Sequence, residues 1–417
     1  MATLRPFRAV RPADSDTAQE VAALPYDVMT SMEARKMTVG RPNSFLHIDR
    51  AEIDLPTTID VYSDEVYLKA RDNFNKMFAE GIFIQDKEPC FYIYREIMDG
   101  RAQYGIVACA SIDEYINGTI KRHELTLEEK EIDRMKHVYV VDANTGPIFL
   151  TYRKRDKIDQ FVSEWVEFHS PVYDFMSSDD GITHTVWVVD NQEAVSTIVK
   201  AFEQVPNLYI ADGHHRNASA VRVGLRKREE NPSYSPDAEF NYYLSVIFPS
   251  DQLKIYDYNR VVKDLNGFKE QEFFGRLTDF FDIERYMGEK YPGPTEPHTF
   301  GMYIGKNWYT LRTHQNLINE NDCIERLDVT IMQEYILSLI LDIKDPRTDK
   351  RIDFVGGIRG LGELVKRVNK DAAVAFAMYP TSIEELLAVA DQDKIMPPKS
   401  TWFEPKLRSG LFVHLLK

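Results

Sequence analysis

The residues best suited to chemistry stand together in one short segment, Asp212-Gly213-His214-His215-Arg216. The pattern predicts a short buried strand over 208–211 and a helix from the segment to about residue 228. The start of a helix leaves backbone N–H groups unpaired, and its dipole attracts negative charge. Gly213 lets the backbone approach a phosphate, and Arg216, one turn further on, adds a permanently charged bidentate donor. The segment therefore predicts a phosphate site, where His214 and His215 donate to the same oxygens or orient a substrate.

Other interpretations of this turn stay open on the residues alone. The histidines would then cap the helix, and Arg216 would pair with a nearby carboxylate. A zinc site is disfavoured, because adjacent histidines on a helix point about 100° apart. The only other glycine cluster, in a predicted Gly-rich loop over 350–362, lacks the Lys-Ser/Thr of a nucleotide-binding P-loop and is interpreted first as a turn.

The elements that must position this turn follow from hydrophobic spacing and turn residues. Asp99-Gly100 separates two strand-like runs, 90–94 and 104–110, and predicts a hairpin. Further strands are expected over 148–152, 184–189 and 242–248. Helices are expected over 31–37, with Ser31 as the cap, and over 57–80, 126–135, 192–202, 267–281 and 329–341. The alternation indicates an α+β fold without a regular βαβ repeat.

Composition limits the class of function. The 417 residues suggest two or three packed units, and three cysteines without C-x-x-C spacing suggest neither disulfides nor a thiolate zinc site. A formal charge of −15 disfavours nucleic acid as a partner. No apolar run is long enough to span a membrane and the first residues lack a signal-peptide pattern, so we expect a cytoplasmic protein without a membrane partner. The sequence leaves a homodimer open.

The turn also resembles known sequences. Gly213-His214-His215-Arg216 resembles the G-x-x-R phosphate motif of the ParB/sulfiredoxin fold, and the preceding residues are similar to its free serine kinase branch. The whole chain resembles a bacterial and archaeal family catalogued as a domain of unknown function, on five segments: Pro25-Tyr26-Asp27-Val28, Ser44-Phe45-Leu46-His47, Lys121-Arg122-His123-Glu124, Ala211 to Arg216, and Met396-Pro397-Pro398-Lys399-Ser400-Thr401.

The resemblance to the kinases implies further site residues. His123 and Glu124 match the segment that delivers a His-Glu pair, in which Glu124 is the catalytic base. Lys399, Ser400 and Thr401 match a late segment that contacts substrate or phosphate. The implied cofactor is Mg²⁺ with ATP or ADP, with Asp212 as a catalytic residue near the metal. From the residues alone, Glu124 would be a solvated acid at a helix start and Lys399 an exposed loop lysine.

The implied activity is transfer of a phosphoryl group from ATP or ADP to free L-serine, giving O-phospho-L-serine. The implied organisation is an N-terminal α/β region over 1–105, a ParB/sulfiredoxin-like nucleotide-binding core over 106–250, and a C-terminal α+β region over 251–417 that completes the site. About 88 residues separate Glu124 from Asp212, which implies an insertion.

The residues leave three other functions to compare with the kinase. A ParB-like regulator that binds and hydrolyses a nucleotide is the main alternative, although the acidic balance counts against DNA binding. A sulfiredoxin-type reductase would need cysteine where His214 stands. A scaffold that keeps a phosphate loop without turnover stays open.

Overall fold

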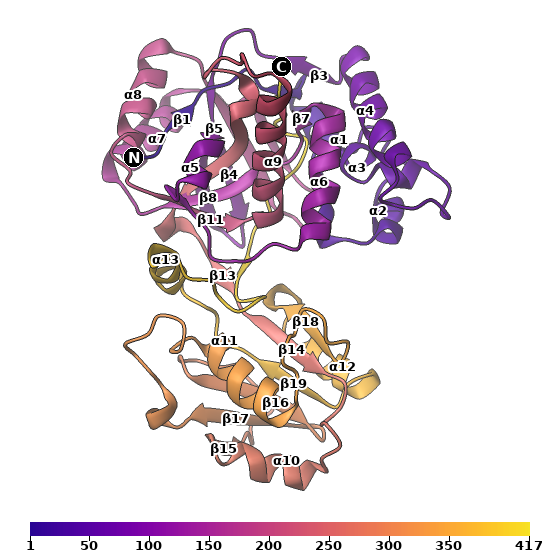
Figure 1. Cartoon of the computed structure of the whole chain (residues 1–417), viewed down its shortest axis with the longest axis vertical. Coiled ribbons are helices and arrows are strands. Elements are labelled where there is room, and N and C mark those ends of the chain that lie inside the picture. The colour runs from indigo at the N-terminus through magenta and orange to yellow at the C-terminus, as the bar shows by residue number, and fades with distance from the viewer. The chain divides into compact units, whose positions relative to one another are not determined.

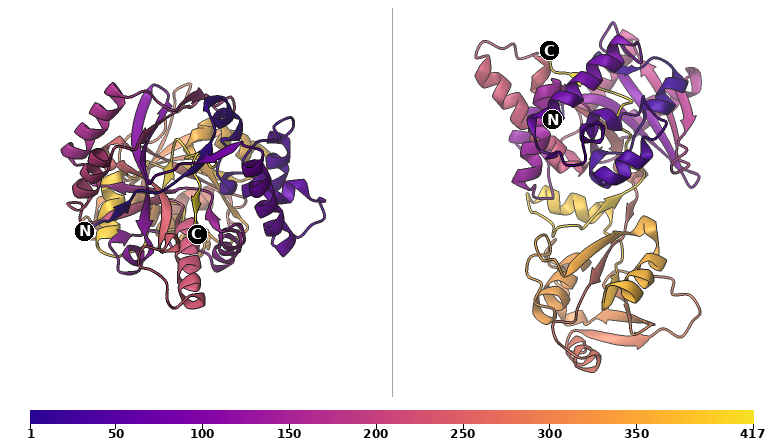
Figure 2. Two further views of the ribbon diagram at one scale, coloured as in Figure 1. Left: turned by 90° about the horizontal axis from the view of Figure 1, so that it is seen from above. Right: turned by 90° about the vertical axis from the view of Figure 1, so that its right-hand side faces the viewer.

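The computed structural model describes all residues from 1 to 417, and they form two compact units. The first unit comprises Met1–Lys121, Thr126–Leu253 and Pro405–Lys417, and the second comprises Arg122–Leu125 and Lys254–Glu404. Both chain ends lie in the first unit (Figure 2). The chain has no helix with the length and apolar character needed to cross a bilayer.

A nine-stranded mixed sheet forms the centre of the first unit. Most neighbours are antiparallel, but β11 runs parallel to β6, and β12 runs parallel to β8. The strands follow in the order β6 (Ile120–Lys121), β11 (Leu208–Asp212), β8 (Ile148–Tyr152), β12 (Tyr242–Pro249), β5 (Arg101–Ser111), β4 (Phe91–Met98), β10 (Thr183–Val189) and β9 (Tyr173–Met176), with β1 (Leu4–Arg5) also paired to β5.

The first unit also contains nine α-helices. They are α1 (Ser15–Val21), α2 (Ser31–Met37), α3 (Leu46–Asp49), α4 (Asp64–Ala79), α5 (Ile112–Ile116), α6 (Glu128–Val141), α7 (Asp156–Phe168), α8 (Gln192–Phe202) and α9 (His214–Glu230). One core joins the apolar faces of α7 and α8 to the sheet, and a second lies among α2, α3 and α4. Helices α6 and α9 lie side by side (Figure 1), and α4 packs on α6.

The last residues of the chain are built into the first unit. Strand β21 (His414–Leu415) pairs with β7 (Ala143–Asn144). A separate two-stranded ladder joins β2 (Val10–Pro12) to β3 (Phe83–Gln85). The backbone of Val413 exchanges hydrogen bonds with Val10, and the side chains of Leu411 to Val413 are buried. This C-terminal segment is therefore part of the core and carries polar side chains into the interior.

The second unit is built on a six-stranded antiparallel sheet. Its strands follow in the order β15 (Phe281–Arg285), β17 (Asn307–Thr313), β16 (Thr299–Ile304), β19 (Val374–Ala377), β14 (Tyr258–Val262) and β18 (Ile352–Gly356), and a separate pair joins β13 (Ile255–Tyr256) to β20 (Trp402–Phe403). Its helical segments are α10 (Glu270–Leu277), α11 (Asp328–Ile331), the π-helical η6 (Met332–Ile340), α12 (Leu361–Lys370) and α13 (Ile383–Asp391). Helix α12 packs across β19, β14 and β16 (Figure 1).

Several sequence predictions are confirmed and others are wrong in detail. The mixed fold, helix α8 and the Asp99-Gly100 hairpin are as predicted, and both turn residues have positive φ, 52° and 77°. The helix predicted over 57–80 begins only at Asp64. The cap predicted at Ser31 is wrong, because Thr30 and Glu33 form the capping box. The glycine cluster interpreted as a turn does form one, the 3-10 turn Gly357–Arg359, but the loop predicted over 350–362 also contains strand β18.

The two predicted domain boundaries, at residues 105 and 250, can be compared with the strands and with the two units of the structure. Residue 105 lies inside β5, so the first two predicted regions contribute strands to the same sheet. Residue 250 follows the end of β12 and lies close to Leu253, where the first unit ends. The ParB/sulfiredoxin-like character of the core stays a prediction.

Candidate functional site

The predicted phosphate turn is assembled at the end of strand β11. The pairing register of β11 with β8 shifts between Ile210 and Asp212, a β-bulge that redirects the chain just before the turn. Gly213 then adopts φ 90°, a conformation that other residues rarely take, and α9 begins at the next residue. No side chain caps this helix start. The local sequence thus builds a helix N-terminus without a side-chain cap directly after strand β11.

Arg216 folds back over the glycine. A Cβ added at Gly213 would lie 3.2 Å from Nε and 3.3 Å from Nη2 of the Arg216 guanidinium. The glycine is therefore needed for two reasons, its positive φ and the room it leaves for this guanidinium. The helix N-terminus and the Arg216 cation occupy one place, as the sequence predicts for a phosphate site.

The guanidinium of Arg216 has a donor that no protein group accepts, unlike an arginine in a structural ion pair. Its Nη1 donates to the carbonyl of Pro147 at 2.6 Å, and its buried Nε has no hydrogen-bond partner. Burial alone would lower the pKa of Arg216, but the carboxylates of Asp27 and Asp212 outweigh it and raise that pKa. The alternative in which Arg216 pairs directly with a carboxylate is not what the structure shows, and a guanidinium with an unused donor suits an anionic ligand.

Asp212 forms an ion pair that the sequence did not reveal. Its Oδ2 accepts a hydrogen bond from Nζ of Lys406 at 2.9 Å, and its Oδ1 accepts one from the backbone N–H of Gly213 at 2.8 Å. Burial would raise the pKa of Asp212, but the Lys406 ammonium and the Arg216 guanidinium hold it well below its ordinary value. Asp212 therefore stays ionised and fixes the turn to the C-terminal segment.

The two histidines of the turn have different surroundings. His214 is buried, whereas Nε2 of His215 accepts a hydrogen bond from the backbone N–H of Leu127 at 3.0 Å. Leu127 is the residue before helix α6. His215 thus ties the first turn of α9 to the start of α6 rather than capping its own helix, and a neutral His215 ring in this bond carries its proton on Nδ1.

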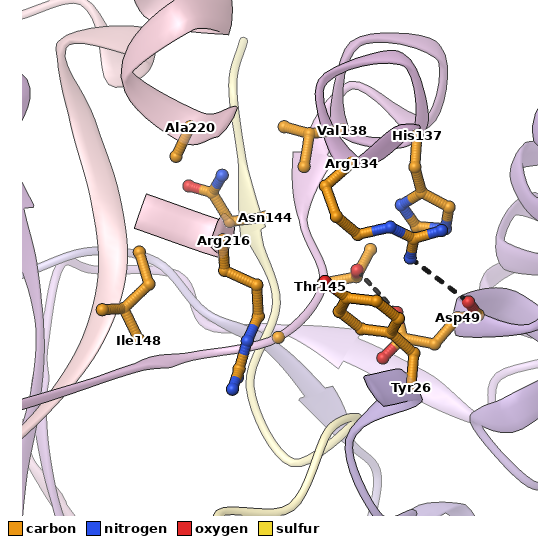
Figure 3. Close-up of a pocket in the computed structure, with 11 residues that line it drawn as sticks. Tyr26, Asp49, Arg134, His137, Val138, Asn144, Thr145, Ile148, Arg216 and Ala220 are labelled. Carbon is orange, nitrogen blue, oxygen red and sulfur yellow. Dashed lines mark hydrogen bonds between the residues drawn. The ribbon is translucent and has the colours of Figure 1, made fainter. Parts of the chain in front are cut away.

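A small pocket of about 30 Å³ adjoins Arg216 inside the first unit (Figure 3). Its volume holds little more than a water molecule. Polar side chains from distant segments face it, and its wall is completed by Gly146 and by apolar residues of α6, β8 and α9. The polar residues are Tyr26, Asp49, Arg134, His137, Asn144, Thr145 and Arg216.

Arg134 is the second cation of this pocket and is well anchored. Its Nη1 donates to the carbonyl of Asp49 at 3.3 Å, and its guanidinium lies 4.1 Å from the centroid of the Tyr26 ring. The Asp49 carboxylate accepts a hydrogen bond from Oγ1 of Thr145 at 2.7 Å (Figure 3). Burial together with Arg134 lowers the pKa of His137, which keeps this ring neutral. Arg134 also forms an ion pair with Asp133, whose Oδ2 lies 2.8 Å from Nε of the guanidinium. The pocket therefore presents two arginines that both lie near carboxylates.

The remaining predicted residues belong to the second unit. There, the backbone N–H of Met396 donates to the carbonyl of His123 at 2.8 Å, so the segment with His123 and Glu124 lies against the loop that carries Lys399. Two segments more than 250 residues apart in the chain are thereby brought together. His123 and Ser400 are buried, and Lys399 is exposed with φ 59°.

Thr401 completes this loop and leads into strand β20. Its neighbour Ser400 is held twice, because its hydroxyl donates to the carbonyl of Pro397 at 2.5 Å and its own carbonyl accepts from Thr381 at 3.0 Å. The loop is therefore held both by a bond within it and by a bond from Thr381, and Lys399 is the member whose backbone departs from ordinary geometry.

The residues around Asp212 do not fit a resident magnesium ion. Both carboxylate oxygens already accept hydrogen bonds, one of them from a cation that Mg²⁺ would have to displace. The described residues also contain no cluster of three or more side chains suited to hold a metal. Asp212 thus serves as the partner of Lys406 in this arrangement, and no chemical step is assigned to a metal bound there.

Sequence reasoning missed the cation that holds Asp212 and most of the pocket. Lys406 lies 194 residues beyond Asp212, so no local pattern links the two. Tyr26 belongs to a family segment that sequence reasoning left outside the site, and Thr145 to a turn that carried no functional signal. The Pro25-Tyr26-Asp27 segment was the one available hint.

Comparison with protein families gives a direct result. The family model described as "Protein of unknown function (DUF1015)" matches residues 4–330. The chain belongs to this family. Among functionally curated proteins, none matches the chain.

Solved structures with a distant likeness are of three kinds. A conserved hypothetical protein from Pyrococcus furiosus is 15% identical with a TM-score of 0.36, and the match covers 75% of this chain and 95% of that one. A variant of a free serine kinase in complex with AMP is 14% identical, with a TM-score of 0.38 and coverage of 74% and 92%. SbnI from Staphylococcus aureus, with a C-terminal truncation, is 13% identical, with a TM-score of 0.39 and coverage of 75% and 89%. Similarities this weak decide neither fold nor function.

Proposed function

We propose that this protein is a small-molecule phosphotransferase that moves a phosphoryl group from ATP or ADP to free L-serine, giving O-phospho-L-serine. One observation supports the phosphate part of this proposal above all others. The uncapped start of α9 and the folded-back guanidinium of Arg216 meet over Gly213, and the guanidinium keeps a buried Nε without a protein acceptor. Such a combination of oriented N–H groups and a positioned arginine suits phosphoryl oxygens.

The proposed reaction assigns a role to each unit. The hydroxyl oxygen of serine attacks the terminal phosphorus of the donor, and the bond from that phosphorus to the leaving nucleotide breaks. Glu124 accepts the hydroxyl proton, because serine's hydroxyl is a weak nucleophile without a base. Arg216 and Lys399 stabilise negative charge on the phosphoryl oxygens. ATP yields ADP, and ADP yields AMP.

The metal is proposed to arrive with the nucleotide. ATP and ADP bind Mg²⁺ through their own phosphate oxygens, and this ion commonly keeps most of its waters in proteins. Asp212, whose oxygens are engaged by Lys406 and Gly213, is assigned to the turn's architecture. His123, His214 and His215 are proposed to orient the substrates.

The first experiment tests product formation. Purified protein is incubated with Mg-ATP or Mg-ADP and L-serine, and phosphoserine is sought by ³¹P NMR and mass spectrometry. Phosphoserine with either donor is the expected result. Phosphorylation of other hydroxy compounds instead of serine would overturn the acceptor, and nucleotide hydrolysis without any phosphorylated acceptor would favour the ParB-like alternative.

The second experiment separates the base from the phosphate site. Glu124→Gln should reduce turnover by about 10²- to 10⁴-fold while nucleotide affinity stays near that of the parent protein. Arg216→Ala should weaken nucleotide binding about 10- to 100-fold in calorimetry, the value of a charge-assisted hydrogen-bond pair. Arg226→Ala is the matched control, because Arg226 lies on the same helix in an exposed pair with Glu230.

These variants also show how the proposal would fail. If Glu124→Gln loses nucleotide affinity but not the rate of phosphoryl transfer, the base assignment is wrong. If Arg216→Ala and Arg226→Ala bind nucleotide equally well, the turn at Gly213 is not the phosphate site.

A further inference from the structure

Arg260 is a buried arginine for which the proposed chemistry has no use. It stands in the middle of β14, with 3% of its surface exposed. Its Nη1 donates to the carbonyl of Tyr258, its Nη2 donates to the carbonyl of Lys399 at 3.1 Å, and its buried Nε has no hydrogen-bond partner. The Phe354 ring lies 5.5 Å from the guanidinium. None of these partners is a carboxylate.

An arginine in these surroundings is unfavourable for stability. Burying a cation without an acid costs free energy that main-chain carbonyls only partly offset. Burial accordingly lowers the pKa of Arg260 to about 10. A side chain of this kind is explained better by what it holds in place than by stability, since an apolar residue of similar size would fill the same space at lower cost.

Arg260 holds the residue with the most unusual backbone in its loop. Lys399 has φ 59°, which is uncommon for a residue with a side chain and needs support from its surroundings. The hydrogen bond from Arg260 to the Lys399 carbonyl is that support. It acts on the main chain, so it sets the direction of the lysine without touching its ammonium group.

The same strand also contacts the lysine side chain. Tyr258 and Arg260 are two residues apart on β14, so their side chains lie on one face of the sheet. The Nζ of Lys399 lies 5.6 Å from the centroid of the Tyr258 ring. One face of β14, a strand paired on both sides, therefore contacts both the backbone and the ammonium group of Lys399, which is the support a precise contact requires.

We propose that Arg260 is the positioning residue for Lys399: from inside the sheet it holds the lysine in its left-handed conformation and adds an unbalanced positive charge behind an anion-binding loop. The proposal rests on the proposed function in one respect, that Lys399 contacts a phosphoryl group. It assigns the second unit an anion subsite of its own, built by β14 and the loop from Met396 to Thr401.

The kinetic test compares three variants. Arg260→Met keeps the volume and removes the charge, Arg260→Lys keeps the charge and one donor, and Lys399→Ala removes the ammonium group. We expect Arg260→Met to raise KM for the phosphoryl donor about tenfold, as Lys399→Ala does, with a smaller change in kcat. The double variant should be no worse than Lys399→Ala alone, because both act through one contact. Arg260→Lys should recover part of the affinity.

A second readout does not depend on activity. Trypsin cleaves after exposed lysines, so the rate of cleavage between Lys399 and Ser400 reports how firmly the loop is held. Arg260→Met should accelerate this cleavage, while its melting temperature stays equal to or above that of the parent protein. Arg312→Met is the matched control, since Arg312 lies in the same sheet in an exposed pair with Glu296.

The outcomes separate this proposal from the proposed function. Unchanged cleavage after Lys399 in Arg260→Met, or a lower melting temperature with unchanged KM, would overturn the positioning role and leave Arg260 a structural residue. If the parent protein makes no phosphoserine and binds neither nucleotide nor inorganic phosphate, the proposed function fails, and faster cleavage in Arg260→Met alone would still support the hold on Lys399.

Discussion

Arg216 in the first unit and Arg260 in the second are both enclosed arginines beside segments predicted to bind phosphate, but their electrostatic surroundings are opposite. Around Arg216, the carboxylates of Asp27 and Asp212 raise its pKa despite burial. Around Arg260, burial lowers the pKa and no acid compensates. Each has a buried Nε without a hydrogen-bond partner. An unused donor is thus common to both, and the balance of charge is what differs.

This difference predicts different consequences of losing each arginine. Arg216 belongs to a network in which Lys406 and two acids also take part, so its removal leaves two carboxylates with one cation fewer. Arg260 has no acid to leave behind. Removing a buried cation that balances acids leaves an uncompensated negative charge, whereas removing a buried cation without acids leaves none.

The largest expected effect is the contrast between two methionine variants. Arg216→Met should lower the free energy of unfolding by about 2–4 kcal/mol, because it removes the cation that lies near both Asp27 and Asp212 and leaves Lys406 as the one cation paired with Asp212. Arg260→Met should lower it by less than about 1 kcal/mol or raise it. Urea denaturation gives the totals, and hydrogen exchange on β11 and β14 peptides locates the change in each unit. Equal losses in the two variants would contradict the comparison.

A smaller effect is expected for the partner of Asp212. Lys406→Met should destabilise the first unit by about 1–3 kcal/mol, since it leaves a carboxylate of which 32% is exposed without its ammonium partner. Lys76→Met is the control, because Lys76 is 70% exposed and its pair with Glu80 should contribute less than about 1 kcal/mol. If both lysines prove equally dispensable in urea denaturation, the C-terminal segment does not anchor the turn.

Much of the local structure could be predicted because it depends on neighbouring residues. Helix α8 could be predicted from its own apolar spacing. The hairpin at Asp99-Gly100 could be predicted because these two residue types tolerate the positive φ values that a two-residue turn needs. The junction of β11, Gly213 and α9 was also predicted, since strand, glycine and helix are consecutive. The assembly of Arg216 over Gly213 follows from the helical spacing of three residues.

The remainder depends on contacts that spacing cannot reveal. Lys406 reaches Asp212 from the chain end, and Arg134 meets Tyr26 across more than 100 residues. Arg260 has the alternating pattern of an ordinary strand, so nothing in the sequence marks it as buried without an acid. The short segment with His123 and Glu124 packs with the second unit although the first unit surrounds it in sequence.

Low pH should affect the stability of the two units differently, because Asp212 belongs to the first unit alone. The pKa of this carboxyl is held below its ordinary value, so its stabilising contribution is present above the unfolded value of about 3.9 and is lost as pH falls from there towards the folded pKa. Asp212→Asn should remove this dependence between about pH 5 and 2. Hydrogen exchange on the α9 peptide is the measurement, and an unchanged acid profile in Asp212→Asn would show that other carboxylates control it.

Alkali should have the smallest effect, and it should act on the second unit. The Nδ1 atom of His298 lies 3.0 Å from Oδ1 of Asp328, and its Nε2 lies 3.6 Å from Oε1 of Glu320. The interaction with the Asp328 carboxylate, together with Glu320 and Glu385, raises the pKa of this histidine. Because the folded pKa is raised, the stabilisation is complete below the unfolded value of about 6.5 and is lost as pH rises through the folded pKa. The melting temperature of His298→Gln should therefore vary less between about pH 6 and 8.5 than that of the parent protein. His314→Gln is the control, since its partner Asp282 is 82% exposed. A loss of pH dependence in both variants would mean that surface charge, not the His298–Asp328 pair, sets the alkaline response.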